Sequence, residues 1–259
     1  MPFDVARYQS LRRSLTVGVE VVHFEDTGST MDEARAGSDA GRPPGTVYVA
    51  AAQSAGRGRL GRSWVSEPGA GLWVTYHLLA GRNAPLLSIA GGLAMVDALQ
   101  TAVGLQADLK WPNDVQHQGR KLCGVLAESR PRGDGSVEVF LGIGLNLRTP
   151  DGLPPEVLAT ATSVEQEGRP APAWEVMLAA LSSALEPWVT LVERDPERLL
   201  DAWRARLVTL GKQVRLSLPD GTSVEGLAVD VAPGGELVID VEGQRRFFAA
   251  GDVTSTRLA

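Results

Sequence analysis

The side chains best suited to chemistry in this chain lie in a glycine-rich segment, residues 56–64. Arg57, Arg59 and Arg62 are separated by small or apolar residues, and the segment ends in Trp64. A guanidinium presents a planar fork of donors that fits carboxylate or phosphate oxygens, and glycine lets the backbone adopt positive φ and approach a ligand closely. The segment is therefore expected to bind an anion, to fold over it, and to be mobile without it.

The same segment matches the dinucleotide-binding pattern G-x-G-x-x-G through Gly56, Gly58 and Gly61. That pattern requires a strand before the glycines and a helix directly after them. Residues 46–50 read as a strand, but residues 71–76 read as a second strand, so the pattern does not indicate a dinucleotide site. A solvated basic loop and a nucleic-acid-binding patch remain open as alternatives for this segment alone.

A second group of polar residues lies at the ends of two later strands. Lys110 closes a strand that a proline then turns, which leaves Asn113 and Asp114 at its exit. Lys121 begins the next strand, so the hairpin between them is expected to return it to Asp114. Asn146 ends a strand of small residues that permits close approach. Two of the three lysines of the chain belong to this group.

Periodicity predicts the elements that must position these residues. Thr30 and Glu33 have the spacing of a capping box, which predicts that Thr30 caps a helix. Pro187 is expected to kink a long later helix, and Asp195 to cap the helix after it. The predicted strands are residues 19–24, 46–50, 71–76, 108–111, 122–127 and 137–144, and the predicted helices are residues 30–36, 86–103, 173–193 and 196–207.

The pattern changes after Gly211, where short strands alternate with hairpin turns. Strands are expected at residues 213–218, 223–231, 236–241 and 245–249. Such a run is typical of a small SH3-like β-barrel. We therefore expect two domains, residues 1–209 and residues 210–259.

Composition narrows the class of protein. The chain has 259 residues and a formal net charge of -6, which argues against a general nucleic-acid-binding protein. We expect no apolar run long enough for a membrane span, and the start has no basic region followed by an apolar one, so a cytoplasmic location is expected. Cys123 is expected to be a buried apolar residue, and three scattered histidines predict no metal cluster.

Taken in order along the chain, these motifs resemble the biotin protein ligase family, from about residue 20 to the C-terminus. The resemblance is to its monofunctional type, which lacks an N-terminal DNA-binding domain. The motifs that carry it are Ser29-Thr30, the segment from Gln53 to Arg62, Lys110-Trp111-Pro112-Asn113-Asp114-Val115, the segment from Lys121 to Glu128, and the segment from Gly142 to Asn146.

The resemblance implies a mixed β-sheet with helices on one side, related to class II aminoacyl-tRNA synthetases, followed by a C-terminal SH3-like domain. It implies an enzyme that activates biotin with MgATP, forming biotinyl-5'-adenylate and pyrophosphate. The biotin would then pass to one lysine of a biotin carboxyl carrier domain. ATP, biotin and Mg²⁺ are the expected ligands, with no nucleic acid and no membrane as partners, and the resemblance leaves monomer and homodimer open.

By position, the resemblance implies a role for each of the residues above. Lys121, Arg59 and Asp114 would be catalytic, with Asp114 helping the acceptor lysine lose its proton. The biotin-binding residues would be Ser29, Thr30, Gln53, Arg57, Gly58, Arg59 and Lys121. The nucleotide-binding residues would be Arg59, Arg62, Trp64, Lys110, Asn113, Lys121 and Asn146, and the metal ligands are not identified.

Two positions depart from the family pattern. Met31 follows the Ser-Thr pair where many relatives carry a polar residue, and Leu60 replaces a basic residue that some members have in the loop. A lipoate or octanoate ligase of the same superfamily is the alternative enzyme, and a nucleic-acid-binding module is the alternative from another class.

Overall fold

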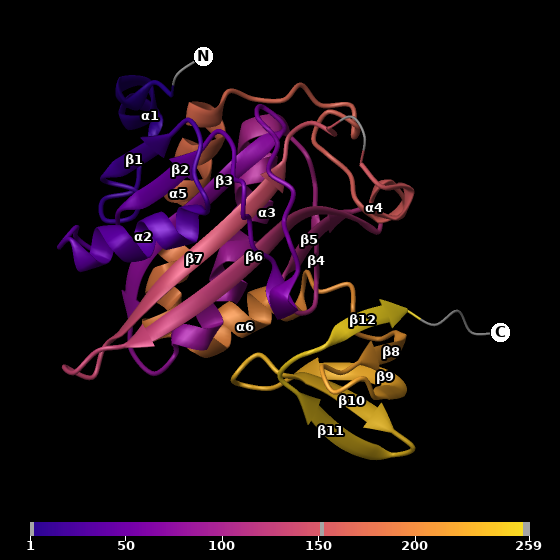
Figure 1. Cartoon of the computed structure of the whole chain (residues 1–259). Helices are drawn as coiled ribbons and strands as arrows, with labels where there is room; N and C mark the ends of the chain where they lie inside the picture. Colours follow the sequence, from indigo (N-terminus) through magenta and orange to yellow (C-terminus); the bar gives the residue numbers. More distant parts are fainter. Residues whose placement is uncertain (1–2, 151–152, 256–259) are drawn as a thin grey trace.

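The computed structural model describes residues 3–150 and 153–255, which form two β-sheets (Figure 1). The larger sheet has the strand order β1-β2-β3-β7-β6-β5-β4. Only β1 and β2 pair in parallel, and every other neighbouring pair is antiparallel, so the sheet is mixed as predicted. Its strands are β1 (Val21–Phe24), β2 (Val47–Ala50), β3 (Gly71–Ala80), β4 (Asp108–Lys110), β5 (Asp114–His117), β6 (Arg120–Pro131) and β7 (Val137–Asn146).

Long helices cover one face of this sheet, because alternate residues of its central strands are apolar. On β3, Leu72, Val74 and Tyr76 are buried in the main hydrophobic core, whereas Trp73 and Thr75 point to the opposite face. The helices behind the sheet in Figure 1 are α3 (Leu87–Val103) and α5 (Trp174–Arg194), with α1 (Val5–Leu11) and α6 (Pro196–Arg204) packed against them.

Helix α2 (Thr30–Asp39) packs on the opposite face, where Met31 and Ala34 contact Tyr48 and Phe140. The predicted capping box is wrong. Ser29 is the N-cap, and its hydroxyl accepts a hydrogen bond from the Met31 amide, 3.3 Å away. Two adjacent residues could each cap this helix, and using Ser29 leaves the Thr30 side chain free to turn into the sheet.

Two strands and one α-helix were not predicted: β5, β12 (Asp252–Ser255) and α4 (Pro155–Thr160). Asp114 was expected in a turn, but it is the first residue of β5, because Val115 pairs with both Leu109 and Cys123. Helix α5 continues through Pro187, and Asp195 caps α6 as predicted by accepting from the Arg198 amide. Cys123 is fully buried, as expected.

The smaller sheet is antiparallel and has the order β11-β10-β9-β8-β12, consistent with a small SH3-like domain. Its first four strands are β8 (Gln213–Ser217), β9 (Ser223–Val231), β10 (Leu237–Val241) and β11 (Gln244–Phe248). The smaller sheet and its β9–β10 turn contact α6 and the end of β4. The Trp111 indole donates to the Gly235 carbonyl over 3.1 Å, and Arg204 pairs with Asp230 over 3.0 Å.

Two helical stretches are long and apolar enough to span a bilayer by length and composition, residues 84–103 and α5. The expectation that no apolar run reaches that length was therefore wrong. Both stretches pack against the main sheet, and about two thirds of the apolar part of the first is buried. A helix buried in a protein core has the same composition as a membrane span.

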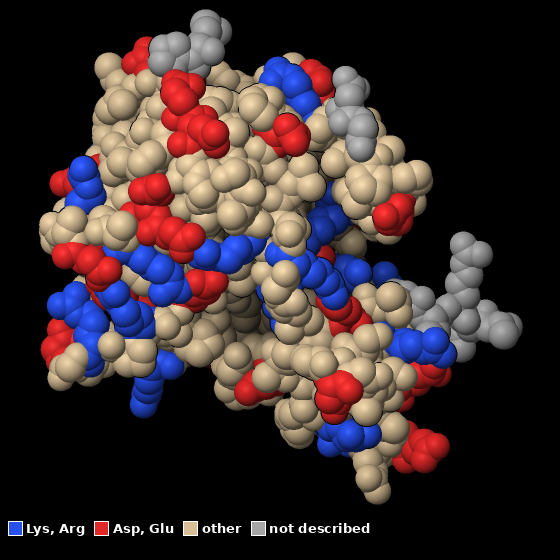
Figure 2. Space-filling view, viewed as in Figure 1, with Lys and Arg blue, Asp and Glu red and all other residues tan. Residues whose placement is uncertain are grey.

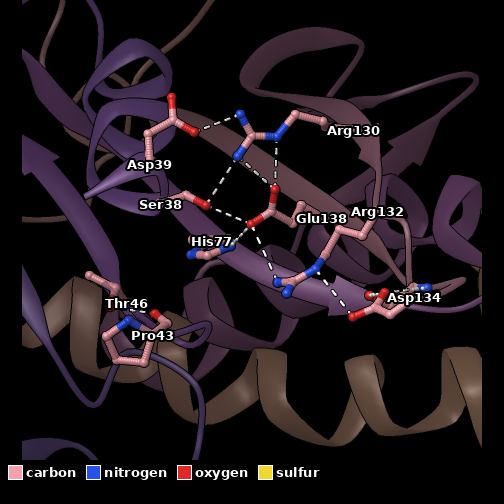
Figure 3. A network of polar contacts seen from close by, with 10 residues as sticks. Ser38, Asp39, Pro43, Thr46, His77, Arg130, Arg132, Asp134 and Glu138 are labelled. Atoms are coloured by element: carbon pink, nitrogen blue, oxygen red, sulfur yellow. Dashed lines mark hydrogen bonds and ion pairs between the residues drawn. The ribbon is translucent and has the colours of Figure 1, made fainter. Parts of the chain in front are cut away.

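A polar network closes one end of the α2 face of the sheet (Figure 3). Glu138 on β7 is buried and accepts from Ser38 over 2.5 Å and from Arg130 over 2.8 Å, and the His77 ring nitrogen lies 3.1 Å from it. Burial raises the pKa of Glu138, but the hydrogen bonds from Ser38 and Arg130 outweigh it and leave the pKa below its ordinary value. The network ties the end of α2 to β6 and β7.

We predict that Glu138→Gln lowers the free energy of unfolding by about 2 kcal/mol at neutral pH, because His77 and two arginines lose a buried charged acceptor. The carboxyl has a depressed folded pKa, so its stabilisation is present above the unfolded pKa and is lost as the pH falls through the folded one. Urea unfolding at neutral pH and at about pH 4 measures this. Asp39→Asn, which removes an exposed partner of Arg130, is the control and should cost less than about 0.5 kcal/mol.

Candidate active site

The site is a hollow on the α2 face of the main sheet, at a level where two neighbouring strands each have a glycine. Gly124 on β6 lies opposite Gly144 on β7 in the strand register. A Cβ added to Gly144 would lie 2.7 Å from the Trp64 indole nitrogen, and one added to Gly124 would lie 2.9 Å from the same ring. The two glycines therefore form a bare floor that lets the Trp64 ring lie close to the sheet, and a larger residue at either position would collide with that ring.

A cavity of about 580 Å³ opens over this floor. Figure 2 shows Lys and Arg side chains gathered along the middle of this face, around a hollow. Every site residue named from the sequence lines the cavity: Ser29, Thr30, Gln53, Arg57, Gly58, Arg59, Arg62, Trp64, Lys110, Asn113, Asp114, Lys121 and Asn146. Residues spread over more than a hundred positions are thus brought to one place.

One end of the cavity is a chain of neutral hydrogen bonds. The Thr30 amide and hydroxyl both donate to the Gln53 side-chain oxygen, over 2.8 and 3.0 Å. The Gln53 amide nitrogen donates to Ser66 over 2.8 Å, and the Thr75 hydroxyl lies 2.9 Å from that of Thr30. Ser29, Thr30, Ser66 and Thr75 are buried, so this end can recognise a polar group in a water-poor setting.

The arginine loop, residues 56–64, forms the outer wall and is tied down at both ends. Arg57 makes two hydrogen bonds to Asp32 on α2, of 2.9 and 2.7 Å, which set the loop against that helix. Arg62 makes a two-pronged ion pair with Asp252 on β12 of the smaller sheet. The loop therefore bridges the two parts of the molecule.

The loop backbone differs in part from the expectation. Gly61 adopts a positive φ of 74°, but Leu60 is also left-handed, with a φ of 56°. That conformation is uncommon outside glycine, and the Leu60 side chain is half exposed at the loop tip. No helix dipole faces the cavity from the loop, since only a short 3-10 turn (Arg59–Gly61) lies in it, so the dinucleotide pattern is excluded here as predicted.

Arg59 is the loop arginine that turns inward. Its guanidinium donates to the Asn113 side-chain oxygen over 3.3 Å, while Asn113 itself donates to the Val125 carbonyl over 2.6 Å. Burial lowers the pKa of Arg59. An arginine side chain in a protein nevertheless carries a positive charge. A charge held away from water favours an anionic ligand.

Lys121 and Asp114 meet as the hairpin predicted. Their charged atoms are 2.6 Å apart, and the Lys121 ammonium lies 5.2 Å from the centroid of the Trp64 ring. The Trp64 ring also meets Trp73 edge to face, with centroids 6.3 Å apart. Lys121 is thus a partly exposed cation held between an aromatic face and a carboxylate, directly beside the glycine floor.

The rest of the wall comes from residues expected to serve a nucleotide and from a segment that was not expected. The Asn146 side chain donates to the Thr162 carbonyl over 3.0 Å, and Lys110 lines the cavity at the end of β4. The segment that was not expected is residues 148–162. Both of its ends and part of α4, among its described residues, also line the cavity.

The cavity wall offers few metal ligands. Within residues 3–150 and 153–255, no group of three or more His, Cys, Asp or Glu side chains could hold an ion. Asp114 and Asp252 are the carboxylates among the described lining residues, and each is paired with a cation. This donor set suits an ion that arrives already bound to phosphate oxygens and keeps its water ligands, as Mg²⁺ does.

Sequence reasoning missed three contributors: Ser66, Thr75 and Asp252. Thr75 is the threonine in the middle of the mainly apolar β3, which was a usable signal for a polar residue facing a site. Asp252 had no such signal, because it belongs to the other sheet and reaches the loop only in the folded molecule.

Comparisons with known proteins agree with this geometry. Residues 28–146 match the model of the biotin/lipoate A/B protein ligase family, and residues 209–254 match that of the biotin protein ligase C-terminal domain. The first match covers both biotin and lipoate protein ligases. The individual relatives distinguish between these two groups.

The biotin--[acetyl-CoA-carboxylase] ligase of Mycobacterium tuberculosis is 36% identical over 89% of this chain and 87% of its own length. That of Paracoccus denitrificans is 35% identical over 81% of this chain and 90% of its own. The structure of the Aquifex aeolicus biotin protein ligase in complex with biotin and ATP superposes with a TM-score of 0.76, at 27% identity, covering 92% and 99% of the two chains. The chain belongs to the biotin protein ligase family.

The tether between the arginine loop and the smaller sheet yields a prediction that does not depend on the reaction. Asp252→Asn removes the charge that holds Arg62, a partly exposed pair whose loss is worth up to about 1 kcal/mol. We expect trypsin to cleave after Arg57, Arg59 or Arg62 about fivefold faster than in the wild type, because the loop opens more often. Mass spectrometry of timed digests measures the rate.

Asp230→Asn is the matched control. Asp230 lies in the same small sheet as Asp252, but it pairs with Arg204 on α6 and, among the residues that the structure describes, makes no ion pair with the arginine loop. An equal gain in loop cleavage in both variants would show that the smaller sheet has merely loosened, and would remove the proposed tether.

Proposed function

We propose that this chain is a biotin protein ligase that forms biotinyl-5'-adenylate from biotin and MgATP and transfers the biotin to a lysine of a biotin carboxyl carrier domain. The observation that carries the proposal is the cavity itself. It joins a neutral polar end, formed around Thr30 and Gln53, to a cationic end that contains Arg59 and Lys121, across the bare floor of Gly124 and Gly144.

The first step needs two anions to meet. The biotin carboxylate attacks the α-phosphorus of ATP, a P–O bond forms, and the bond to pyrophosphate breaks. Arg59 and Lys121 offset the repulsion between the carboxylate and the triphosphate, and they stabilise the charge that grows on the leaving pyrophosphate. Arg57 and Arg62 lie on the same loop, so closing the loop adds to this field. When bound to ATP, Mg²⁺ would neutralise part of the phosphate charge.

The neutral end of the cavity would hold the biotin ring system, with Ser29, Thr30, Gln53 and the Gly58 backbone around it. Bound in this way, the acid would direct its carboxylate towards Lys121. For the nucleotide we propose Arg62, Trp64, Lys110, Asn113 and Asn146, of which Asn113 is already hydrogen-bonded to Arg59.

In the second step, the neutral amine of the acceptor lysine attacks the acyl carbon, an amide bond forms, and AMP leaves. Asp114 lies in the cavity wall beside Lys121 and is our candidate to take the proton that the amine must lose. The pairing with Lys121 orients the carboxylate before the acceptor arrives.

Some wider properties are part of the same proposal. We assign residues 1–209 to the catalytic domain and residues 210–259 to the SH3-like domain, since the C-terminal family match starts at residue 209. We place the enzyme in the cytoplasm, where its carboxylase substrate would be made. Relatives named for acetyl-CoA carboxylase support a carrier domain of that enzyme class as the acceptor.

Exchange of labelled pyrophosphate into ATP tests the first step, with biotin as the acid and lipoate and octanoate as controls. We expect exchange with biotin alone. Arg59→Ala and Lys121→Ala should each lower its kcat/KM by about a hundredfold or more, because each removes charge stabilisation of the transition state. Arg215→Ala and Lys212→Ala, which change exposed residues of the smaller sheet, should leave it unchanged.

Exchange that depends on lipoate or octanoate would assign the chain to the other branch of the superfamily. No exchange with any of the three acids would contradict adenylate formation altogether.

A further inference from the structure

Thr75 has no assigned role in the reaction, yet it lies at the polar end of the cavity. It is fully buried in the middle of β3, on the face that points to α2. Its partner in the register of β7 is Gly142, which has no side chain to cover the hydroxyl. The hydrogen-bond partner of that hydroxyl in the described structure is the Thr30 hydroxyl, 2.9 Å away. A buried hydroxyl needs such a partner.

The direction of each hydrogen bond in this group can be deduced. The Thr30 backbone amide can only donate, so the Gln53 atom 2.8 Å from it must be the oxygen, and the Gln53 nitrogen must face Ser66. The Thr30 hydroxyl also donates its single proton to the Gln53 oxygen. The hydrogen bond between the two threonines therefore runs from Thr75 to Thr30.

These directions fix what the cavity offers to a ligand. The Gln53 nitrogen has a second hydrogen that Ser66 does not use, and the Thr30 oxygen has a second lone pair that Thr75 does not use. The polar end thus presents one donor beside one acceptor. A cyclic urea, with its C=O next to an N–H, is the complementary group.

We propose that Thr75 is a positioning residue for acid recognition: it donates to Thr30 and holds the Thr30 hydroxyl with its free lone pair directed at a ureido N–H of the ligand. This inference rests on the proposed function and concerns the same site. Thr75 acts through Thr30 and takes no part in the transfer of the acyl group.

The test is steady-state pyrophosphate exchange by wild type, Thr75→Val and Thr75→Ser, with biotin and with its two analogues methylated on one ureido nitrogen. Valine keeps the shape and removes the donor, so we expect KM for biotin to rise about threefold to tenfold, the worth of one hydrogen bond. The KM for ATP and kcat should not change. Serine keeps the donor and should restore the KM for biotin.

The analogues separate positioning from a general loss of packing. For the isomer that lacks the N–H accepted by Thr30, Thr75→Val should cost nothing further, whereas the other isomer should lose as much as biotin does. Thr46→Val is the matched control, because Thr46 is also a buried threonine, on the neighbouring chain segment, but its hydroxyl donates to the Pro43 carbonyl at the far end of the sheet (Figure 3). It should leave every KM unchanged.

An unchanged KM for biotin in Thr75→Val, an equal loss for all three acids, or a fall in kcat would each overturn the proposal. If the valine variant does not fold, the Thr75→Ala variant replaces it and the same comparison of acids applies. Wild-type exchange with biotin is measured in the same series, so a failure of the proposed function shows there and is distinct from a failure of this inference.

Discussion

The site depends on one packing constraint: two adjacent strands of a helix-backed sheet must both be bare at the same level. Gly124 and Gly144 are partners in the register of β6 and β7, so their missing side chains leave room for the Trp64 ring to lie close over the floor of the cavity. On the other face of the same strands, Cys123, Val125 and Leu145 are fully packed against the core. The sheet can therefore be solid on one side and hollow on the other, since side chains alternate between the faces.

Around this hollow, the two ends of the cavity are built on different physical principles. Neutral hydrogen bonds close the end at Thr30 and Gln53. Every buried donor there needs a matched acceptor, so a ligand can bind this end only in an orientation that completes these hydrogen bonds. Cations line the other end, where attraction is strong but not directional. A ligand with a polar neutral head and a carboxylate tail is held in one orientation by this difference.

The arginine loop connects that orientation to the rest of the molecule. Asp32 on α2 holds one arginine and Asp252 on the smaller sheet holds another, while Arg59 between them faces the cavity. Each tether is a partly exposed ion pair of modest strength. The arginine loop can thus cover the cavity during the reaction and still open for exchange of ligands. Through Asp252, the smaller sheet contributes directly to the geometry of the site.

Much of this site could be predicted from the sequence, because its chemistry is concentrated in local motifs. The meeting of Lys121 with Asp114 follows from a short hairpin, and the three loop arginines lie in one short segment of the chain. The exact cap of α2 could not be predicted, since Ser29 and Thr30 are equally suited to it. The contribution of Asp252 could not be predicted from local pattern, because it arises only when the second sheet packs against the loop. Thr75 left a local signal, a hydroxyl between apolar neighbours, but its contact with Thr30 arises only when distant segments pack.

The most direct test of the central claim is to fill the floor of the hollow. Gly144→Val places a branched side chain where the Trp64 ring and a ligand must fit, and Gly133→Val, in the open turn between β6 and β7, is its control. Native mass spectrometry with biotin and MgATP would detect the bound adenylate. We expect a retained adenylate in the wild type and in the control, and none in a folded Gly144→Val variant. Adenylate bound equally in all three proteins would contradict the role of the glycine floor.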